Sequence, residues 1–162
     1  MTFYGASVIH PKTIKPIFNK NIPLRVKCFL DITEEGTTIS KDTNAKVITS
    51  YIVKKAQAFI RIKPKDFSFM EERLMQEIFD HIYKSGVKVN LVQNSAISLM
   101  LCVDEKPADI LAFESLLLDK FDVEIKKDLQ LYTMINFSVK DLKQAIDSVM
   151  VQQHDNKLFL VK

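Results

Sequence analysis

The stretch that decides the fold runs from residue 86 to residue 103 and reads GVKVNLVQNSAISLMLCV. It opens on Gly86, which is typical of a helix end because glycine adopts the left-handed cap conformation without strain. Residues 87–93 and 96–103 are rich in Val, Leu and Ile and predict two strands, with the polar residues at 94 and 95 as the turn between them. The stretch therefore predicts a helix that ends at Gly86 and is followed by a β-hairpin.

The segments on either side complete a larger unit. Apolar residues recur with a helical period through residues 70–82, and Ser68 followed by Glu71 matches a capping box at the start of that helix. Alternation over residues 52–62 predicts a strand before the helix. After the hairpin, Pro107 predicts the start of a second helix, and residues 121–126 alternate as a last strand. The order β-α-β-β-α-β within residues 52–126 is the ferredoxin-like arrangement.

Residues 127–162 begin a partial second copy. They predict a strand over 129–136, a helix capped by Ser138 with Asp141 in its third position, and a hairpin formed by 149–154 and 157–161. This copy lacks a second helix and a fourth strand, so it would bury little apolar surface alone. Residues 22–30 alternate and have no other sheet to join, so we expect them to complete it.

The sequence thus predicts an α+β protein of two ferredoxin-like modules. The first module, residues 52–126, is expected to be inserted into a second one that is discontinuous and truncated. That second module would consist of residues 22–40 plus 127–162, completed by its N-terminal strand.

Composition narrows the function classes. The 162 residues are 47% hydrophobic and 27% charged, which is typical of a soluble globular protein. The net charge of +3 is small and evenly spread, which argues against nucleic acid as a partner. No apolar run approaches the roughly 20 residues of a membrane span, and no secretory signal is recognisable. Cys28 and Cys102 are expected to be reduced thiols in a cytoplasmic protein.

Catalytic and metal chemistry find no support in the sequence. The three glycines lie far apart, whereas a phosphate-binding loop needs several close together. The three histidines, His10, His81 and His154, have no cysteine or carboxylate cluster at ligand spacing. We therefore expect no catalytic residue, no metal site and no cofactor in this chain.

Three stretches resemble the aspartokinase family. Residues 4–14, YGASVIHPKTI, resemble the signature GA-x-V-[IL]-HP-x-[TA]-[ILV] at the end of that family's catalytic region. Residues 21–26, NIPLRV, followed by Gly36 and Thr37, resemble its NIP-[VL]-x-V…GT stretch. Residues 86–95 resemble the second strand and effector loop of the family's first ACT module. The C-terminal third of the chain matches mainly in pattern.

The resemblance implies a C-terminal regulatory region of an aspartate kinase, an enzyme that phosphorylates the side-chain carboxylate of aspartate with ATP on the route to lysine, threonine and methionine. Residues 1–21 would be the end of the catalytic region or a connector, and the kinase core, with its ATP and Mg, would precede residue 1. The fragment alone would then be inactive as a kinase. The family's ACT modules pair side by side and bind amino-acid effectors at that junction. The implied partners are therefore the kinase domain, a second copy of the chain, and lysine or threonine.

A free amino acid needs amide donors for its carboxylate, which the first turn of a helix offers, and acceptors for its ammonium group. The helix expected near Ser68, with the loop leading into it, could supply the donors. Polar side chains at and beyond the neighbouring strand could supply the acceptors, and by resemblance they fall on effector-loop positions. The candidate effector-binding residues are Phe67, Ser68, Phe69, Asn90, Asn94 and Ser95.

Several alternatives stay open at this point. Many lysine-sensitive family members carry Asp where Asn90 stands and Glu where Ala96 stands, so both lysine and threonine remain candidates. Capping is the alternative role of Ser68, and turn chemistry is that of Asn90 and Asn94. A module that only dimerises the enzyme is the main competing function. An RNA-binding domain would need stacking aromatics on the central strands, and an acylphosphatase-like enzyme would need a phosphate loop with a paired Arg; neither feature is evident.

Overall fold

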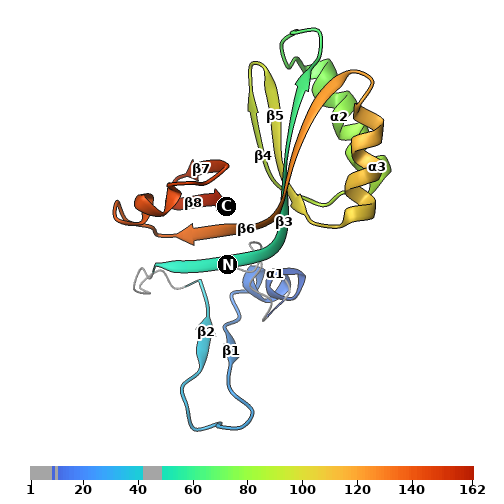
Figure 1. Cartoon of the computed structure of the whole chain (residues 1–162). Helices are drawn as coiled ribbons and strands as arrows, with labels where there is room; N and C mark the ends of the chain where they lie inside the picture. Colours follow the sequence, from blue (N-terminus) through green and yellow to red (C-terminus); the bar gives the residue numbers. More distant parts are fainter. Residues whose placement is uncertain (1–8, 10, 42–48) are drawn as a thin grey trace. The chain divides into compact units, whose positions relative to one another are not determined.

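The computed structural model describes residues 9, 11–41 and 49–162 (Figure 1). The chain divides into two compact units, Met1–Ile48 and Thr49–Lys162, and each is described by itself. Among the described residues, no helix has both the length and the apolar character needed to cross a membrane. In chain order the elements are α1 (Pro11–Asn19), β1 (Leu24–Val26), β2 (Thr37–Ile39), β3 (Ser50–Pro64), α2 (Glu72–Ser85), β4 (Val89–Ser95), β5 (Ser98–Asp104), α3 (Pro107–Leu117), β6 (Phe121–Ile135), the 3₁₀ helix η2 (Asp141–Ala145), β7 (Met150–His154) and β8 (Lys157–Val161).

The N-terminal unit contains α1 and the β1–β2 hairpin. The two strands are antiparallel, with Val26 opposite Thr37, and form a two-stranded sheet. Gly36 precedes β2 with a φ of +69°, and a Cβ at this position would lie 2.3 Å from the carbonyl oxygen of Val26. Only glycine fits such a close approach, which explains the glycine of the Gly-Thr pair in this segment. Most of the signature at residues 4–14, His10 included, lies outside the described residues.

The second unit is built on a six-stranded antiparallel sheet with the order β4-β5-β3-β6-β8-β7. Its first four strands, together with α2 and α3, form the first module, and both helices cover the same face of these strands (Figure 1). Between the sheet and the helices lies a core that includes Ile60, Leu101, Ile78 and Phe113. This arrangement confirms the predicted α+β class and the β-α-β-β-α-β order.

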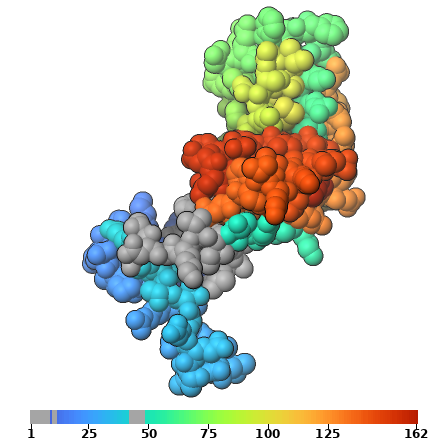
Figure 2. Space-filling model, turned by 90° about the vertical axis from the view of Figure 1, so that its left-hand side faces the viewer, coloured from blue at the N-terminus to red at the C-terminus, as the bar shows by residue number. Residues whose placement is uncertain are grey.

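The long strands β3 and β6 extend beyond the first module and carry the second. The first part of β3 pairs with the second part of β6, with Ile52 opposite Thr133. The same part of β6 pairs with β8 on its other side, and β8 pairs with β7. Residues 50–54 therefore supply the fourth strand of the second module. Figure 2 shows the orange to red surface of this module directly beside the green to yellow surface of the first.

The prediction that residues 22–30 complete the second sheet is wrong. Leu24–Val26 pairs with Thr37–Ile39 in a separate sheet, and the edge of β6 is taken by β3. The physical reason is continuity, because a strand that already pairs with β6 at Phe121 keeps the same neighbour past Asp128 at no further loop-closure cost. An N-terminal strand does complete the module, but it is the first part of β3.

The helix predicted after Ser138 is also wrong. In its place lies η2, a single 3₁₀ segment of five residues. The carboxylate of Asp141 accepts hydrogen bonds from the amide and hydroxyl of Ser138 and from the Tyr51 hydroxyl at 2.6 Å. Two apolar residues of the segment expected to be helical, Val139 and Ile146, are 82% and 68% exposed. The predicted hairpin across Asp155 and Asn156 is present, formed by β7 and β8.

Candidate functional site

The predicted site residues fall into two groups at opposite ends of the first module's sheet. Asn94 lies opposite Leu99, a residue of the helix-covered core, and its amide approaches the Met75 sulfur in α2 at 3.6 Å. Asn90 instead bonds to Gln57 and Asp104, at the other end of β4. The structure therefore separates Asn90 from the remaining candidates.

One hydrogen bond joins the other two predicted segments. The amide of Met70, at the end of the loop that carries residues 67–69, donates to the carbonyl of Ala96 at 2.8 Å. Ala96 is in the β4–β5 turn and directly follows Asn94 and Ser95. The loop and the turn thus form one end of the module, as Figure 1 shows for the connections β3–α2 and β4–β5. We call residues 65–70 together with 94–97 the loop end.

The capping box predicted at Ser68 is wrong. The helix begins at Glu72, and its N-cap, Glu71, makes no side-chain capping bond. The amide and hydroxyl of Ser68 both donate to Asp66 Oδ1, at 3.1 and 2.7 Å. These bonds lower the pKa of Asp66, the hydroxyl making the largest contribution. Because Asp66 lies two residues before Ser68, its carboxylate accepts the hydrogen bonds of Ser68. The Ser68 side chain therefore does not cap the helix.

This local turn defines what the loop end offers to a ligand. Phe67 has a φ of +60°, and the side chains of Phe67 and Phe69 are 96% and 65% exposed. Within the described part of the chain, the backbone amides of these two residues donate to no partner. The carboxylate of Asp66 adds a negative charge beside them. The loop end therefore presents amide donors, one carboxylate and apolar surface, the groups that a zwitterion with an aliphatic stem needs.

Asp66 is a residue that the sequence-based selection missed. Its signal is the Asp-x-Ser spacing, which is typical of an Asx turn. At the other side of the loop end, Ser95 Oγ lies 2.9 Å from Ser98 Oγ, and Asn94 is exposed. Asn94 and Ser95 thus keep polar groups at this end, whereas Ser68 has both of its donors occupied by Asp66.

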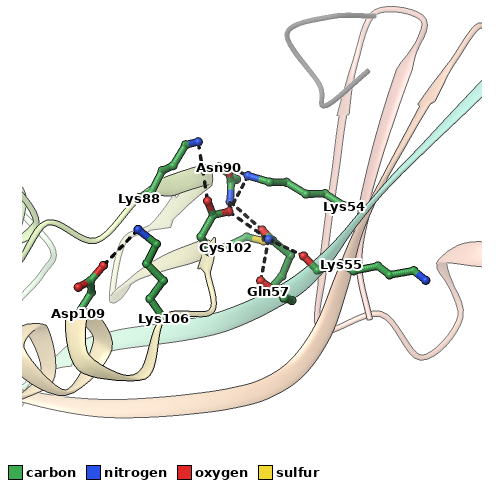
Figure 3. Close-up of polar contacts among 10 residues, drawn as sticks. Lys54, Lys55, Gln57, Lys88, Asn90, Cys102, Lys106 and Asp109 are labelled. Atoms are coloured by element: carbon green, nitrogen blue, oxygen red, sulfur yellow. Dashed lines mark hydrogen bonds and ion pairs between the residues drawn. The ribbon is translucent and has the colours of Figure 1, made fainter. Parts of the chain in front are cut away.

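Asn90 belongs to a polar network at the junction of the two modules (Figure 3). Its amide group donates to Gln57 Oε1 and to Asp104 Oδ1, each at 2.7 Å, and its oxygen accepts from Lys54 Nζ at 2.8 Å. Lys54 Nζ also lies 2.5 Å from Asp104 Oδ1. Because all of its hydrogen-bonding groups have partners, Asn90 has little left with which to hold an effector.

Hydrogen bonds and the charge of Lys54 stabilise the ionised form of Asp104 in this network. Burial alone would raise the pKa of Asp104, but hydrogen bonds from Lys54, Asn90 and Gln57, with the Lys54 charge, outweigh burial and lower the pKa to about 2. The thiol of Cys102 donates to Gln57 Oε1 at 3.5 Å, and burial raises its pKa to about 12. This thiol is therefore protonated and chemically inert at neutral pH. No cluster of metal-ligating side chains occurs among residues 9, 11–41 and 49–162.

Comparison with known proteins identifies several relatives of this chain. No protein-family model matches the sequence. The chloroplastic aspartokinase 3 of Arabidopsis thaliana is 30% identical over 106 residues, which cover 64% of this chain and 19% of that protein. Over these residues, this chain is similar to an aspartokinase. Other curated aspartokinases that it matches come from Escherichia coli and Saccharomyces cerevisiae.

Solved structures show the same fold. E. coli aspartokinase III in complex with lysine and aspartate matches with a TM-score of 0.78 and 19% identity, over all of this chain and 40% of that one. A putative C-terminal regulatory domain of aspartate kinase from Porphyromonas gingivalis W83 matches with a TM-score of 0.59 and 15% identity, over 70% of this chain and 85% of that one. This chain therefore shares its fold with an aspartokinase and with that putative regulatory domain. It spans about a fifth of the length of the Arabidopsis relative.

Proposed function

We propose that this chain is the regulatory region of an aspartokinase, which binds an end-product amino acid at the loop end and thereby sets the activity of a kinase domain. The observation that carries the proposal is the 2.8 Å bond from Met70 to Ala96, which brings the loop at 65–70 beside the turn at 94–97. The E. coli structure of the same fold was solved with lysine and aspartate bound. The proposal includes regulation of a kinase domain whose substrates are aspartate and ATP.

The chemistry of the loop end suits the backbone of an amino acid. The carboxylate of the amino acid would accept hydrogen bonds from the free backbone amides of Phe67 and Phe69. The ammonium group of the amino acid would pair with Asp66 or with the oxygens of Asn94 and Ser95. Phe67 and Phe69 would cover the aliphatic part of the side chain. This arrangement is compatible with lysine and with threonine, and only a binding measurement separates them.

Calorimetric titration with lysine and with threonine tests the proposal. One of them is expected to bind, and Asn94→Ala should weaken that binding about tenfold because it removes one hydrogen-bonding group at the site. The matched control is Gln153→Ala, which removes an exposed amide from β7, outside the loop end. If neither amino acid binds, the purely structural function is favoured. If an amino acid binds equally well to both variants, the effector site is not at the loop end.

Pairing of two copies through β4 forms the second part of the proposal. β4 is an edge strand of the six-stranded sheet, and an unpaired edge is open to another strand. Exposed apolar side chains accompany this edge, namely Val92 on β4 and Ile97 in the following turn, which are 37% and 56% exposed. A dimer formed here would place two loop ends close to the interface, where an effector could influence the pairing.

The two edge strands of the sheet provide a matched test of this dimer. Val92→Lys on β4 should raise the dimer dissociation constant at least about tenfold, because a charge would be buried in the interface. Val151→Lys on β7, where Val151 is 40% exposed, should leave the constant unchanged. Sedimentation velocity measures both. A monomeric wild-type chain, or dissociation by Val151→Lys alone, would contradict pairing through β4.

We also propose that the protein is located in the cytoplasm. Cys28 is an exposed free thiol and Cys102 a buried one, as expected for the reducing cytoplasm that the sequence predicts.

A further inference from the structure

Both long strands are interrupted at the same level of the sheet. In β3 the register shifts between Lys54 and Gln57, and in β6 a compensating shift lies between Lys126 and Leu129. Each strand therefore carries one extra residue, and each contains a residue with positive φ, Ala56 at 53° and Asp128 at 58°. Paired bulges of this kind bend a sheet, and Figure 1 shows β3 and β6 turning between the two modules.

Two consecutive residues at the end of β5 contact both interruptions. The amide of Glu105 donates to the Ala56 carbonyl at 2.8 Å, and its carboxylate accepts from the Asp128 amide at 2.8 Å. Asp104 Oδ1 accepts from Lys54 Nζ at 2.5 Å and from Gln57 Nε2 at 3.1 Å. Glu105 thus binds backbone groups at both bulges, and Asp104 binds side chains on either side of the bulge in β3. We call these two residues the clasp.

The clasp is half-buried, and its carboxylates have hydrogen-bond partners. Gln57, at the centre of the interruption, is only 1% exposed, and its amide group also donates to the carbonyls of Lys55 and Ala56 at 3.1 and 2.9 Å. Figure 3 shows Gln57 between Lys54 and Cys102, with Asn90 reaching the same network from β4. A partly buried polar network whose members are hydrogen-bonded favours one arrangement of the surrounding backbone, since other arrangements leave polar groups unpaired.

We propose that the clasp, Asp104 with Glu105, fixes the bend in β3 and β6 and so holds the second module in one orientation relative to the first. Lys54, Gln57 and Asn90 are positioning residues of this device. The clasp lies at the end of β5, whose other end directly follows the loop end, so it gives a mechanical link from the proposed effector site to the second module. The link itself needs no effector, and its test is therefore independent of the proposed function.

Distance measurement by spin-label pairs tests this proposal on the whole chain. One label replaces Ser115, exposed on α3, and the other replaces Gln153, exposed on β7, in a Cys28→Ser background. Cys102 is buried and stays unlabelled. The wild-type clasp should give one narrow distance distribution. The double variant with Asp104→Ala and Glu105→Ala should at least double its width, whereas Asp109→Ala, which removes a nearby exposed ion pair with Lys106, should not.

A second readout covers the case in which the double variant fails to fold. Glu105→Ala alone removes the acceptor of the Asp128 amide but keeps the bond from its own amide to Ala56. Hydrogen exchange at Asp128 should then accelerate at least tenfold, and the distance distribution should broaden. An unchanged width in a folded clasp variant, or in Glu105→Ala with accelerated exchange at Asp128, would overturn the proposal. Neither result depends on whether lysine or threonine binds.

Discussion

The two modules share long strands but differ in what covers them. In the first module, α2 with 14 residues and α3 with 11 pack on the sheet and enclose a core that includes Phe113 and Phe121. In the second, the five-residue η2 covers a small cluster around Met134, Leu158 and Leu160. Helices therefore bring most of the buried surface, and a module without them depends on strands that its neighbour holds in place.

The comparison predicts the largest effect for a cavity in the first module. Phe113 is fully buried on α3, so Phe113→Ala should lower the free energy of unfolding by about 3–5 kcal/mol. Because β3 and β6 are shared, the second module should unfold in the same transition. Urea unfolding followed by circular dichroism measures the change. A loss below about 1 kcal/mol, or a second module that unfolds separately, would contradict this role of the first module.

A cavity in the second module should cost less. Leu160 is also fully buried, but its cluster is smaller and lies beside the short η2, so the neighbours can collapse into the space. Leu160→Ala should therefore lower the free energy of unfolding by about 2–3 kcal/mol. Hydrogen exchange should accelerate in β7 and β8 while α2 and β5 keep their protection. If Leu160→Ala exposes both modules equally, the proposed dependence of one module on the other runs in both directions.

The junction between the modules should respond to pH. The pKa of Asp104 is about 2 in the folded chain, below its ordinary value of 3.8, so the ionised form stabilises the fold. The stabilisation that ionised Asp104 contributes is therefore fully present above about pH 5 and is lost as the pH falls through 4 towards 2. It amounts to about 2 kcal/mol. Urea unfolding from pH 6 to pH 2 should show the gap between wild type and Asp104→Asn closing, whereas a gap that stays constant would refute it.

Asp119→Asn is the matched control for this pH series, because it removes one exposed carboxylate outside the junction. Its unfolding free energy should follow that of the wild type within about 0.5 kcal/mol at each pH. A control variant that reproduces the behaviour of Asp104→Asn would mean that net charge, rather than the Lys54–Asp104 pair, sets the pH dependence.

The smallest effect is expected for a substitution after Ser138, where the sequence predicts a helix and the structure has only η2. Ile146 is 68% exposed, so Ile146→Ala should change the free energy of unfolding by less than about 0.5 kcal/mol. A buried stripe position on a full helix would instead cost about 2 kcal/mol or more. Denaturant unfolding separates the two cases, and a large loss would show that residues 138–149 form the longer helix in solution.

Local signals in the sequence were enough for the first module. Gly86 ends α2 with a φ of 74°, and Pro107 stands at the first turn of α3, as their chemistry predicts. The hairpin between β7 and β8 follows from Asp155, which adopts a φ of 50° in the turn. Each of these features depends on residues close together in the chain, which is why the pattern alone identifies them.

Most of the features that the sequence did not reveal depend on distant partners. Asp141 accepts from Tyr51, 90 residues away, and Asn90 bonds to Lys54 and Gln57 across the sheet. Polar residues at 127 and 128 were interpreted as a gap between strands, although β6 passes through them as a bulge. In the candidate site, the pattern placed Asn94 and Ser95 beside the loop at 65–70, but the role of Asp66 was hidden because its hydrogen bonds replace the expected cap.

The most direct test of this account is a titration of the isotope-labelled chain with lysine and with threonine, followed by backbone amide NMR. One of the two amino acids is expected to shift the amides of residues 65–70 and 94–97 first and most strongly, with smaller shifts near Asp104 and Glu105. Shifts that begin in β7 and β8, or no shifts with either amino acid at millimolar concentration, would contradict an effector site at the loop end.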